Sequence, residues 1–451
     1  MGRGELVVQP PTRYAWLGRD RIAYQVVGEG PVDLVFTPGS FGNIDMVWED
    51  PAAALFLRRL ASFSRLIRFD RRGTSASDPL SLDALPPWEA YADEMTAVLD
   101  EVGSDRPAVM ATLDAGPMAM FFAATYPERT AALILVNTTA RWVATASYPT
   151  GISRELAESL TRRLDEVWGT EEMVDLAAPS RAGDDRFRSW YARFQRSIAG
   201  PRAVQAFAGA LFETDARSIL PSIQVPTLVM HRESYAFLPV DHGRYLAEQI
   251  PGATFVELAG SDGVVYWETP DEILERVEGF LVGVPRGVSA SRSLATVLFT
   301  DIVRSTERAA EVGDRRWREI LNVHDDVARG HVEASGGRFI KSTGDGILAT
   351  FDGPGRGIRA AEAIRDDLRP IGVELRAGLH TGEVETRGDD VGGIGVHIAA
   401  RVMAEAAAGE ILISRTVRDL VVGSNIRTVD RGTHVLKGVE GDWELFEVTS
   451  A

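Results

Sequence analysis

Residues 108–136, AVMATLDAGPMAMFFAATYPERTAALILV, decide the architecture of the first half of the chain. A short apolar run ends at a turn around Leu113, a stretch of helix length follows, and a second apolar run closes at Val136. Two short apolar runs joined through one helix predict a β-α-β unit with parallel strands.

Similar signals extend on both sides of this unit. Apolar runs closed by turn residues occupy 32–39, 65–73, 107–113, 131–137 and 225–231, and helical stretches occupy 87–103 and 240–252. This alternation predicts a mostly parallel sheet with helices on both faces. Residues 145–215 are rich in Arg, Asp, Trp and Phe and lack strand signals, so they predict a helical insertion.

The pattern changes after FLVGVPRGVSASRS (280–293), a stretch with the composition of a linker. We therefore expect a front domain over 1–282, a linker over 283–293 and a rear domain over 294–451. In the rear domain we expect a strand at 294–301, a long helix over 306–335, a hairpin over 336–351, a helix from Gly355, a strand at 373–385, a helix at 393–409 and final short strands. This order predicts an α+β domain, an antiparallel sheet with helices on one side.

Composition narrows the function classes. The 451 residues suffice for two or three domains, and the net charge of −17 argues against a nucleic-acid or anionic-membrane partner. The absence of cysteine excludes disulfides, thiolate zinc sites and iron–sulfur clusters, and it suits a reducing compartment. The first residues, MGRGELVVQPPTRYAW, lack a signal-peptide pattern, and no apolar run reaches the roughly 18 residues of a membrane span. We expect a cytoplasmic protein.

Three segments of the front domain carry a family resemblance. TPGSFGNIDMVWEDP (37–51), RFDRRGTSASDP (68–79) and FFAATYPER (121–129) resemble α/β-hydrolases with a helical cap, and the resemblance covers residues 1–285.

An active member has a serine at the strand-to-helix elbow, an acid after a later strand and a histidine after the last one. Leu113, Tyr235 and Gly263 stand at these positions here. We therefore predict a hydrolase frame without its triad. Hydrolysis through Asp114, one residue past the elbow, is the less favoured alternative.

A capped fold of this type keeps an apolar cavity at the strand ends even without a triad. Two interpretations of the front domain stay open at this point. It is a scaffold or dimerisation body, or it is a sensor whose cavity binds a small apolar ligand and regulates the rear domain.

The rear domain, residues 293–451, resembles the catalytic domain of class III adenylyl and guanylyl cyclases. The motifs are LFTDIVRST (298–306), STGDG (342–346), LRAGLHTG (375–382), GDDVGGIGVHIAAR (388–401) and HVLKGVEG (434–441). The resemblance implies a ferredoxin-like α+β domain in which Asp301, Ile302 and Asp345 hold two divalent ions, Mg²⁺ or Mn²⁺. Such ions prefer carboxylate oxygens, bridge phosphates and lower the pKa of an attacking hydroxyl. Taken alone, Asp301 would be a helix N-cap and Asp345 a turn residue.

The resemblance also assigns the phosphate contacts. Backbone N–H groups between Ile302 and Thr306, including those of Val303 and Ser305, would bind the β and γ phosphates at the start of a helix. Arg376 and Lys437 match further triphosphate contacts.

Four more residues complete the implied site. Lys341 and Asp390 match the donor and the acceptor with which the family reads adenine, so ATP is the expected substrate. Arg401 matches the arginine that offsets charge in the transition state. His397 stands where the family most often has an asparagine that positions the ribose, and we expect slower turnover because of it.

The resemblance thus implies a homodimeric adenylyl cyclase that converts ATP into 3′,5′-cyclic AMP and pyrophosphate. Each of two equivalent sites would combine the aspartates and Arg376 of one chain with the other groups of its partner. Two alternatives remain: a non-catalytic nucleotide-binding sensor that His397 has disabled, and an esterase-type hydrolase with a regulatory rear domain.

Overall fold

The computed structural model describes residues 9–37, 39, 42–83, 85–283, 292–387 and 390–450. The chain divides into a front unit, Met1–Pro86 with Ala90–Ser289, and a rear unit, Pro87–Glu89 with Ala290–Ala451. Most of the linker expected over 283–293 lies outside the described residues. Within the described ranges, no helix combines the length and apolar character that a membrane crossing needs.

The front unit contains an eight-stranded sheet in the order β1-β2-β4-β3-β5-β6-β7-β8. Its strands are β1 (Arg13–Leu17), β2 (Asp20–Val27), β3 (Asp33–Thr37), β4 (Arg65–Phe69), β5 (Ala108–Thr112), β6 (Ala132–Val136), β7 (Thr227–Arg232) and β8 (Thr254–Leu258). From β4 to β8 all neighbours are parallel, whereas β1 and β2 add an antiparallel end. The five expected strands correspond to β3–β7. The edge strands β1 and β8 are partly exposed, which weakens their apolar signal.

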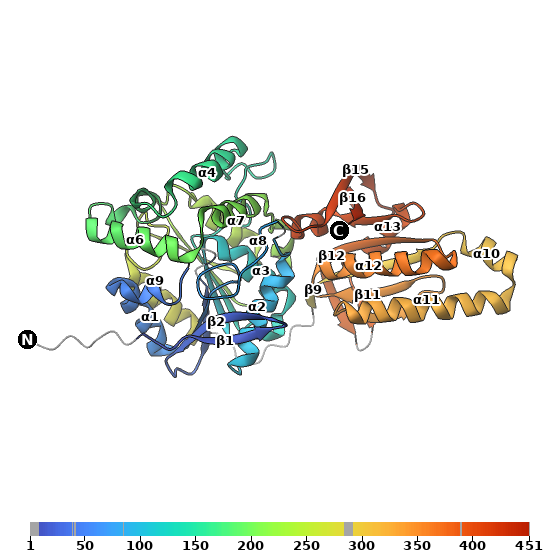
Figure 1. Ribbon diagram of the computed structural model, residues 1–451, viewed down its shortest axis with the longest axis horizontal. Coiled ribbons are helices and arrows are strands. Elements are labelled where there is room, and N and C mark those ends of the chain that lie inside the picture. The colour runs from blue at the N-terminus through green and yellow to red at the C-terminus, as the bar shows by residue number, and fades with distance from the viewer. Residues whose placement is uncertain are drawn as a thin grey trace, which may run out of the picture. The chain divides into compact units, whose positions relative to one another are not determined.

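The helices of the front unit form two groups (Figure 1). The sheet is accompanied by α1 (Pro51–Phe63), α2 (Trp88–Glu101), α3 (Gly116–Thr125), α8 (Asp241–Gln249) and α9 (Pro270–Val282). The expected insertion forms a cap of α4 (Arg154–Val167), α5 (Val174–Ala177), α6 (Asp185–Ile198) and α7 (Pro201–Glu213). Every residue of α3 is buried, which explains why its sequence has no polar face.

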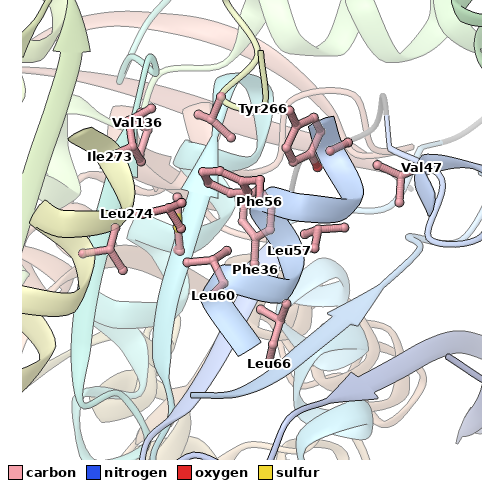
Figure 2. Close-up of a cluster of buried hydrophobic side chains, with 14 of the residues drawn as sticks. Phe36, Val47, Phe56, Leu57, Leu60, Leu66, Val136, Tyr266, Ile273 and Leu274 are labelled. Atoms are coloured by element: carbon pink, nitrogen blue, oxygen red, sulfur yellow. The ribbon is translucent and has the colours of Figure 1, made fainter. Parts of the chain in front are cut away.

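The main core of the front unit lies between the sheet and the helices α1 and α9. Figure 2 shows Phe36 of β3 beside Phe56 and Leu60 of α1, with Tyr266 at one end of the cluster. The ring of Tyr266 meets the rings of Phe36 and Phe56 edge-on, with centroids 6.1 and 5.5 Å apart. This packing places aromatic side chains directly beneath the cap.

The rear unit contains a second sheet in the order β10-β11-β9-β12-β14-β16-β15, with β13 paired to β12. Its strands are β9 (Arg292–Ile302), β10 (Arg338–Ser342), β11 (Ile347–Phe351), β12 (Leu375–Arg387), β13 (Asp390–Gly392), β14 (Ile411–Ser414), β15 (Arg427–Val435) and β16 (Asp442–Ser450). Only β12 and β14 are parallel neighbours, so the sheet is mixed rather than fully antiparallel. The expected hairpin is formed by β10 and β11.

Helices cover both faces of this sheet, and the expectation of helices on one side was wrong. Leu298 of β9 packs with α11 (Asp314–Ala334) and α12 (Pro354–Leu368), which lie side by side in Figure 1. The preceding residue of β9, Val297, packs with α13 (Ile394–Glu405). Successive residues of a strand point to opposite faces, so α13 lies on the other side.

Two further elements of the rear unit differ from the expectation: the long helix and the final strands. The helix expected over 306–335 is two helices, α10 (Ser305–Val312) and α11, because Gly313 between them adopts a left-handed φ of 79°. The final strands are not short: β15 and β16 have nine residues each, and the helix α14 (Arg415–Leu420) precedes them.

Candidate functional site

Two aspartates meet where β9 ends. Asp301 is the penultimate residue of β9, and Asp345 lies in the turn between β10 and β11. The Ile302 amide donates a hydrogen bond to the carbonyl oxygen of Asp345 at 2.8 Å. Gly346 approaches β9 so closely that a Cβ would lie 1.8 Å from the carbonyl oxygen of Thr300, so only glycine fits. The turn is therefore held against the end of the strand.

The two carboxylates share one electrostatic environment. Burial raises the pKa of Asp301, Asp345 raises it further by like-charge repulsion, and Arg376 opposes both effects. Arg376 stands directly opposite Asp301 on β12, and its Nη2 lies 2.6 Å from the Asp301 Oδ2. The Ser305 hydroxyl donates to the Asp345 Oδ2 at 2.5 Å. Four expected site residues are thus brought together.

This pair has the donor chemistry of a site for hard divalent ions. Two nearby carboxylates repel one another, and a cation between them relieves that repulsion. In the part of the chain that the structure describes, no group of three or more acidic or histidine side chains is arranged to hold a metal. Ions at Asp301 and Asp345 would therefore need further oxygens, from the backbone near Ile302 and from substrate phosphates.

The backbone after β9 differs from the expected phosphate-binding segment. The Ile302 amide bonds to Asp345, and the Val303 amide donates to the Glu374 carbonyl oxygen at 2.9 Å. These two N–H groups therefore have partners already. The N–H groups of Ser305 and Thr306 open α10, and the first N–H groups of a helix have no partner within it. They are the ones suited to a phosphate.

The two expected adenine-reading residues lie together at a second place in the rear unit. Lys341 of β10 donates through Nζ to both carboxylate oxygens of Asp390 on β13, at 2.8 and 2.7 Å. This hydrogen bond is the main cause that lowers the pKa of Asp390. Both side chains are about half exposed, so a donor and an acceptor stand side by side at the surface.

The remaining expected residues face solvent. His397 and Arg401 are one turn apart on α13, whose opposite face buries Ile398 and Val402. Lys437 is exposed between β15 and β16. None of these three side chains makes a hydrogen bond or ion pair within the described residues. The structure therefore does not join them to the aspartates within one chain.

The elbow of the front unit keeps its backbone shape. Leu113, between β5 and α3, has a left-handed φ of 52°, which costs a residue other than glycine about 1 kcal/mol or more. The Thr138 hydroxyl donates to the Leu113 carbonyl oxygen. Leucine offers no nucleophile, and the adjacent Asp114 is buried 3.7 Å from the Arg71 guanidinium.

At the other two triad positions, the side chain of Tyr235 occupies the space beside Gly263. A Cβ added at Gly263 would lie 2.6 Å from the ring and hydroxyl of Tyr235. The Tyr235 ring thus fills the volume that a side chain at 263 would occupy. Next to it, Asp262 accepts hydrogen bonds from the amide and hydroxyl of Ser180 in the cap, at 2.9 and 2.6 Å. The position that matches the family's base is thus occupied by packing against Tyr235.

A cavity of about 170 Å³ lies between these positions and the cap. Leu113, Tyr235 and Gly263 line it, together with many aromatic side chains. Arg68, Trp142 and Trp190 also line it and were not expected from the sequence. For Arg68 a signal exists, because it interrupts the buried apolar strand RLIRF of β4.

Known proteins resemble different parts of this chain. A protein of Rhizobium meliloti provisionally named an adenylate cyclase is 30% identical over 168 residues, which cover 34% of this chain and 27% of that protein. The chain thus spans about a quarter of that relative's length. A Petunia hybrida protein named karrikin insensitive 2 receptor IA is 22% identical over 247 residues, covering 54% of this chain and 87% of that protein.

Structure comparison identifies the fold of the front unit. The esterase structure from Exiguobacterium antarcticum is 17% identical, covers 60% of this chain and 99% of its own, and gives a TM-score of 0.52. The family profile described as alpha/beta hydrolase fold matches residues 34–270, more than half of the chain. The protein therefore belongs to the α/β-hydrolase fold family.

Proposed function

We propose that the protein is a homodimeric adenylyl cyclase that forms 3′,5′-cyclic AMP from ATP, with residues 1–282 as a regulatory part and 294–451 as the catalytic part. The observation that carries this proposal is the approach of Asp301 and Asp345 at the end of β9, with Arg376 beside them. The similarity to a provisionally named adenylate cyclase supports it. A cytoplasmic location belongs to the same proposal, since the chain has no cysteine.

The chain's own residues divide the binding of ATP. Lys341 would donate to the ring nitrogen of adenine and Asp390 would accept from its amino group, in place of the bond they make to each other. The N–H groups that open α10 would hold the phosphates. Mg²⁺ or Mn²⁺ held by Asp301 and Asp345 would neutralise phosphate charge and lower the pKa of the ribose 3′-hydroxyl.

The chemical step exchanges one phosphorus–oxygen bond for another. The 3′-oxygen attacks the α-phosphorus, the bond to the pyrophosphate oxygen breaks, and the hydroxyl proton leaves to solvent. Arg401 offsets the charge that develops on the α-phosphate, and His397 orients the ribose through one hydrogen bond. Lys437 and Arg376 contact the triphosphate.

The surface position of one set of these groups supports a homodimer. His397, Arg401 and Lys437 are exposed and have no partners among the described residues. Ile394, one turn before His397 on α13, is 58% exposed although it is apolar. A second chain placed on this surface would cover Ile394 and bring the three polar groups to the partner's aspartates.

The test is cyclic AMP formation by the full-length protein with ATP and Mn²⁺. Asp301→Asn should lower the rate about a thousandfold, because it removes a charge from the ion-binding pair. Asp366→Asn is the matched control: Asp366 is exposed on α12 and pairs only with its neighbour Arg365, at 2.8 Å. Equal product from the Asp301 variant and the control would refute the cyclase.

A second candidate is a nucleotide-binding sensor without turnover. His397 favours it, because the asparagine expected at that position positions the ribose. ATP binding without any product in the wild type would establish this candidate. The third interpretation, an esterase, has little support, because Leu113 leaves no nucleophile at the elbow and Gly263 leaves no base after β8.

For the front unit, the sensor interpretation is favoured over the scaffold. The unit retains a cavity where the triad would stand, and one relative over this length is named a receptor. A ligand would regulate the cyclase only if it bound two arrangements of the protein with different affinity.

A further inference from the structure

Arg68 is a charged side chain in the middle of the front sheet. It belongs to β4 and is 0% exposed. Its strand position puts it on the same face as Leu66, which packs with Phe36 and Tyr266 in the main core. A guanidinium in such surroundings is costly unless hydrogen bonds and an opposite charge compensate it.

The compensation of this guanidinium is incomplete, although the Tyr266 hydroxyl and the Asp70 carboxylate interact with it. Its Nε, Nη1 and Nη2 are all buried, and none has a hydrogen-bond partner within the described residues. The ring centroid of Phe36 lies 5.9 Å from the Arg68 Cζ. Burial raises the pKa of the neighbouring Tyr266 phenol, and the Arg68 cation opposes this effect.

Asp70 interacts electrostatically with Arg68, but its hydrogen bonds go to other groups. Asp70 accepts hydrogen bonds from the amides of Ile44 and Ala76, at 3.0 and 3.2 Å. Burial raises its pKa to about 7, and Arg68 lowers it only in part. Near neutral pH, Asp70 therefore supplies at most a partial negative charge. Arg68 is left as a cation without a full counter-charge.

Two tryptophans around the same cavity repeat this imbalance. The Nε1 donors of Trp142 and Trp190 are buried without an acceptor within the described residues. By contrast, Trp168 and Trp267 line the same cavity and are satisfied, by the Ala199 carbonyl and the Asp50 carboxylate, each at 2.9 Å. Some indole N–H groups of the cavity wall therefore have acceptors and others do not. Arg68, Trp142 and Trp190 each present hydrogen-bond donors.

We propose that this cavity binds a small aromatic carboxylate, whose carboxylate pairs with Arg68 and whose ring lies among the aromatic walls. A bidentate carboxylate supplies both the acceptors and the negative charge that Arg68 lacks. The volume of about 170 Å³ is close to the roughly 150 Å³ cavity that holds benzene, so one ring and a short acid chain fit. Long-chain lipids are too large.

Other ligand classes fit less well. An amine would add a cation beside Arg68, and a neutral hydrocarbon would leave the guanidinium unpaired. Asp114, the one acid among the described residues of the wall, stands beside the Arg71 cation. Because the nitrogens of Arg68 are closed to solvent, a carboxylate reaches them when neighbouring side chains shift, and we expect slow association.

The test is calorimetric titration of the full-length protein with three probes: phenylacetate, phenylacetamide and acetate. Phenylacetate should bind at least tenfold more tightly than either of the others, because only it has both the charge and the ring. In Arg68→Met, phenylacetate and phenylacetamide should bind equally. Arg68→Lys, which keeps the charge, should retain part of the preference.

The matched control is a substitution of Arg163, which also lines the cavity. Arg163 is 61% exposed at its side chain and pairs with Glu172 at 3.5 Å, so Arg163→Met should leave the preference unchanged. Equal binding of phenylacetate and phenylacetamide to the wild type would overturn the proposal. So would an undiminished preference in Arg68→Met, or acetate binding as tightly as phenylacetate. These readouts measure binding alone and do not depend on cyclase activity.

Discussion

The elbow at Leu113 in the front unit and the turn at Asp345 in the rear unit are both tight bends that present one side chain. The first keeps a left-handed backbone but presents a leucine, whereas the second presents a carboxylate to another carboxylate. The backbone shape of a bend therefore does not by itself indicate chemistry. Function has to be argued from the side chains that the bend brings together, as they are at Asp301 and Asp345.

The strongest test of this comparison is a substitution that disturbs the turn at Asp345 and leaves both carboxylates in place. Gly346→Ala would force a Cβ to 1.8 Å from the Thr300 carbonyl oxygen. We expect a cost on the order of 3 kcal/mol and a drop of at least about a hundredfold in cyclic AMP formation. Thermal unfolding and the activity assay measure the two effects.

Gly330→Ala provides the control for that variant. Gly330 lies within α11, is exposed, and has open space where a Cβ would go. Alanine there should raise stability by about 0.5–1 kcal/mol and leave activity unchanged. Similar behaviour of the two variants would show that the approach of Gly346 to β9 does not matter.

The stability of the front unit should depend on pH through the buried Asp70. The unfolded chain ionises Asp70 near its ordinary value, whereas the folded chain holds the proton up to about pH 7. The unfolded state thus loses the proton first, and stability should fall as pH rises from about 4 to 7, by at most about 4 kcal/mol.

Asp70→Asn isolates this contribution, because asparagine stays neutral. The stability difference between wild type and variant should change over that pH range, while other groups such as the buried His231 and His242 cancel in the comparison. Asp83→Asn, at a side chain 89% exposed, should give a constant difference. A flat difference for Asp70→Asn would mean that its carboxylate ionises normally.

His397→Asn sharpens the comparison from the rear side. If the rear unit has kept working chemistry, asparagine at this position should raise the rate of cyclic AMP formation by about ten- to a hundredfold. Because His397 is exposed, the substitution should leave the fold intact and thermal unfolding unchanged. A slower variant would show that the imidazole has taken over the positioning role.

The smallest expected effect concerns the strain at the empty elbow. Both Leu113→Ala and Leu113→Gly remove the side chain, but only glycine adopts a φ of 52° without cost. The glycine variant should be more stable than the alanine variant by about 1 kcal/mol in thermal unfolding. The usual order, with alanine more stable, would indicate that the backbone relaxes at this position.

Much of the fold could be predicted from local sequence patterns. The apolar runs of β3 to β7 and the Gly-Asp-Gly turn of the β10–β11 hairpin depend on neighbouring residues, and they lie where expected. The placement of α13 depends on long-range packing. Consecutive apolar residues such as Val297 and Leu298 were compatible with two covered faces, but they did not say which helix covers which.

The candidate sites divide in the same way. The positions of Asp301 and Asp345 followed from motif resemblance, and pairing of the strands brings them together. The amides of Ile302 and Val303 could not be assigned correctly, because their partners Asp345 and Glu374 are distant in sequence. Arg68 was missed because charged residues are usually placed at the surface, and only the structure shows it buried.

The ring of Tyr235 limits which side chains can be introduced at position 263. Restoring a histidine at 263 would put its Cβ 2.6 Å from that ring, so Tyr235 would have to change in the same step. A serine at 113 would be needed as well before any ester could be turned over. Single substitutions therefore do not lead back to a hydrolase. If the cavity binds the proposed aromatic carboxylate, the front unit would leave it chemically unchanged, and occupancy would follow the ligand concentration reversibly.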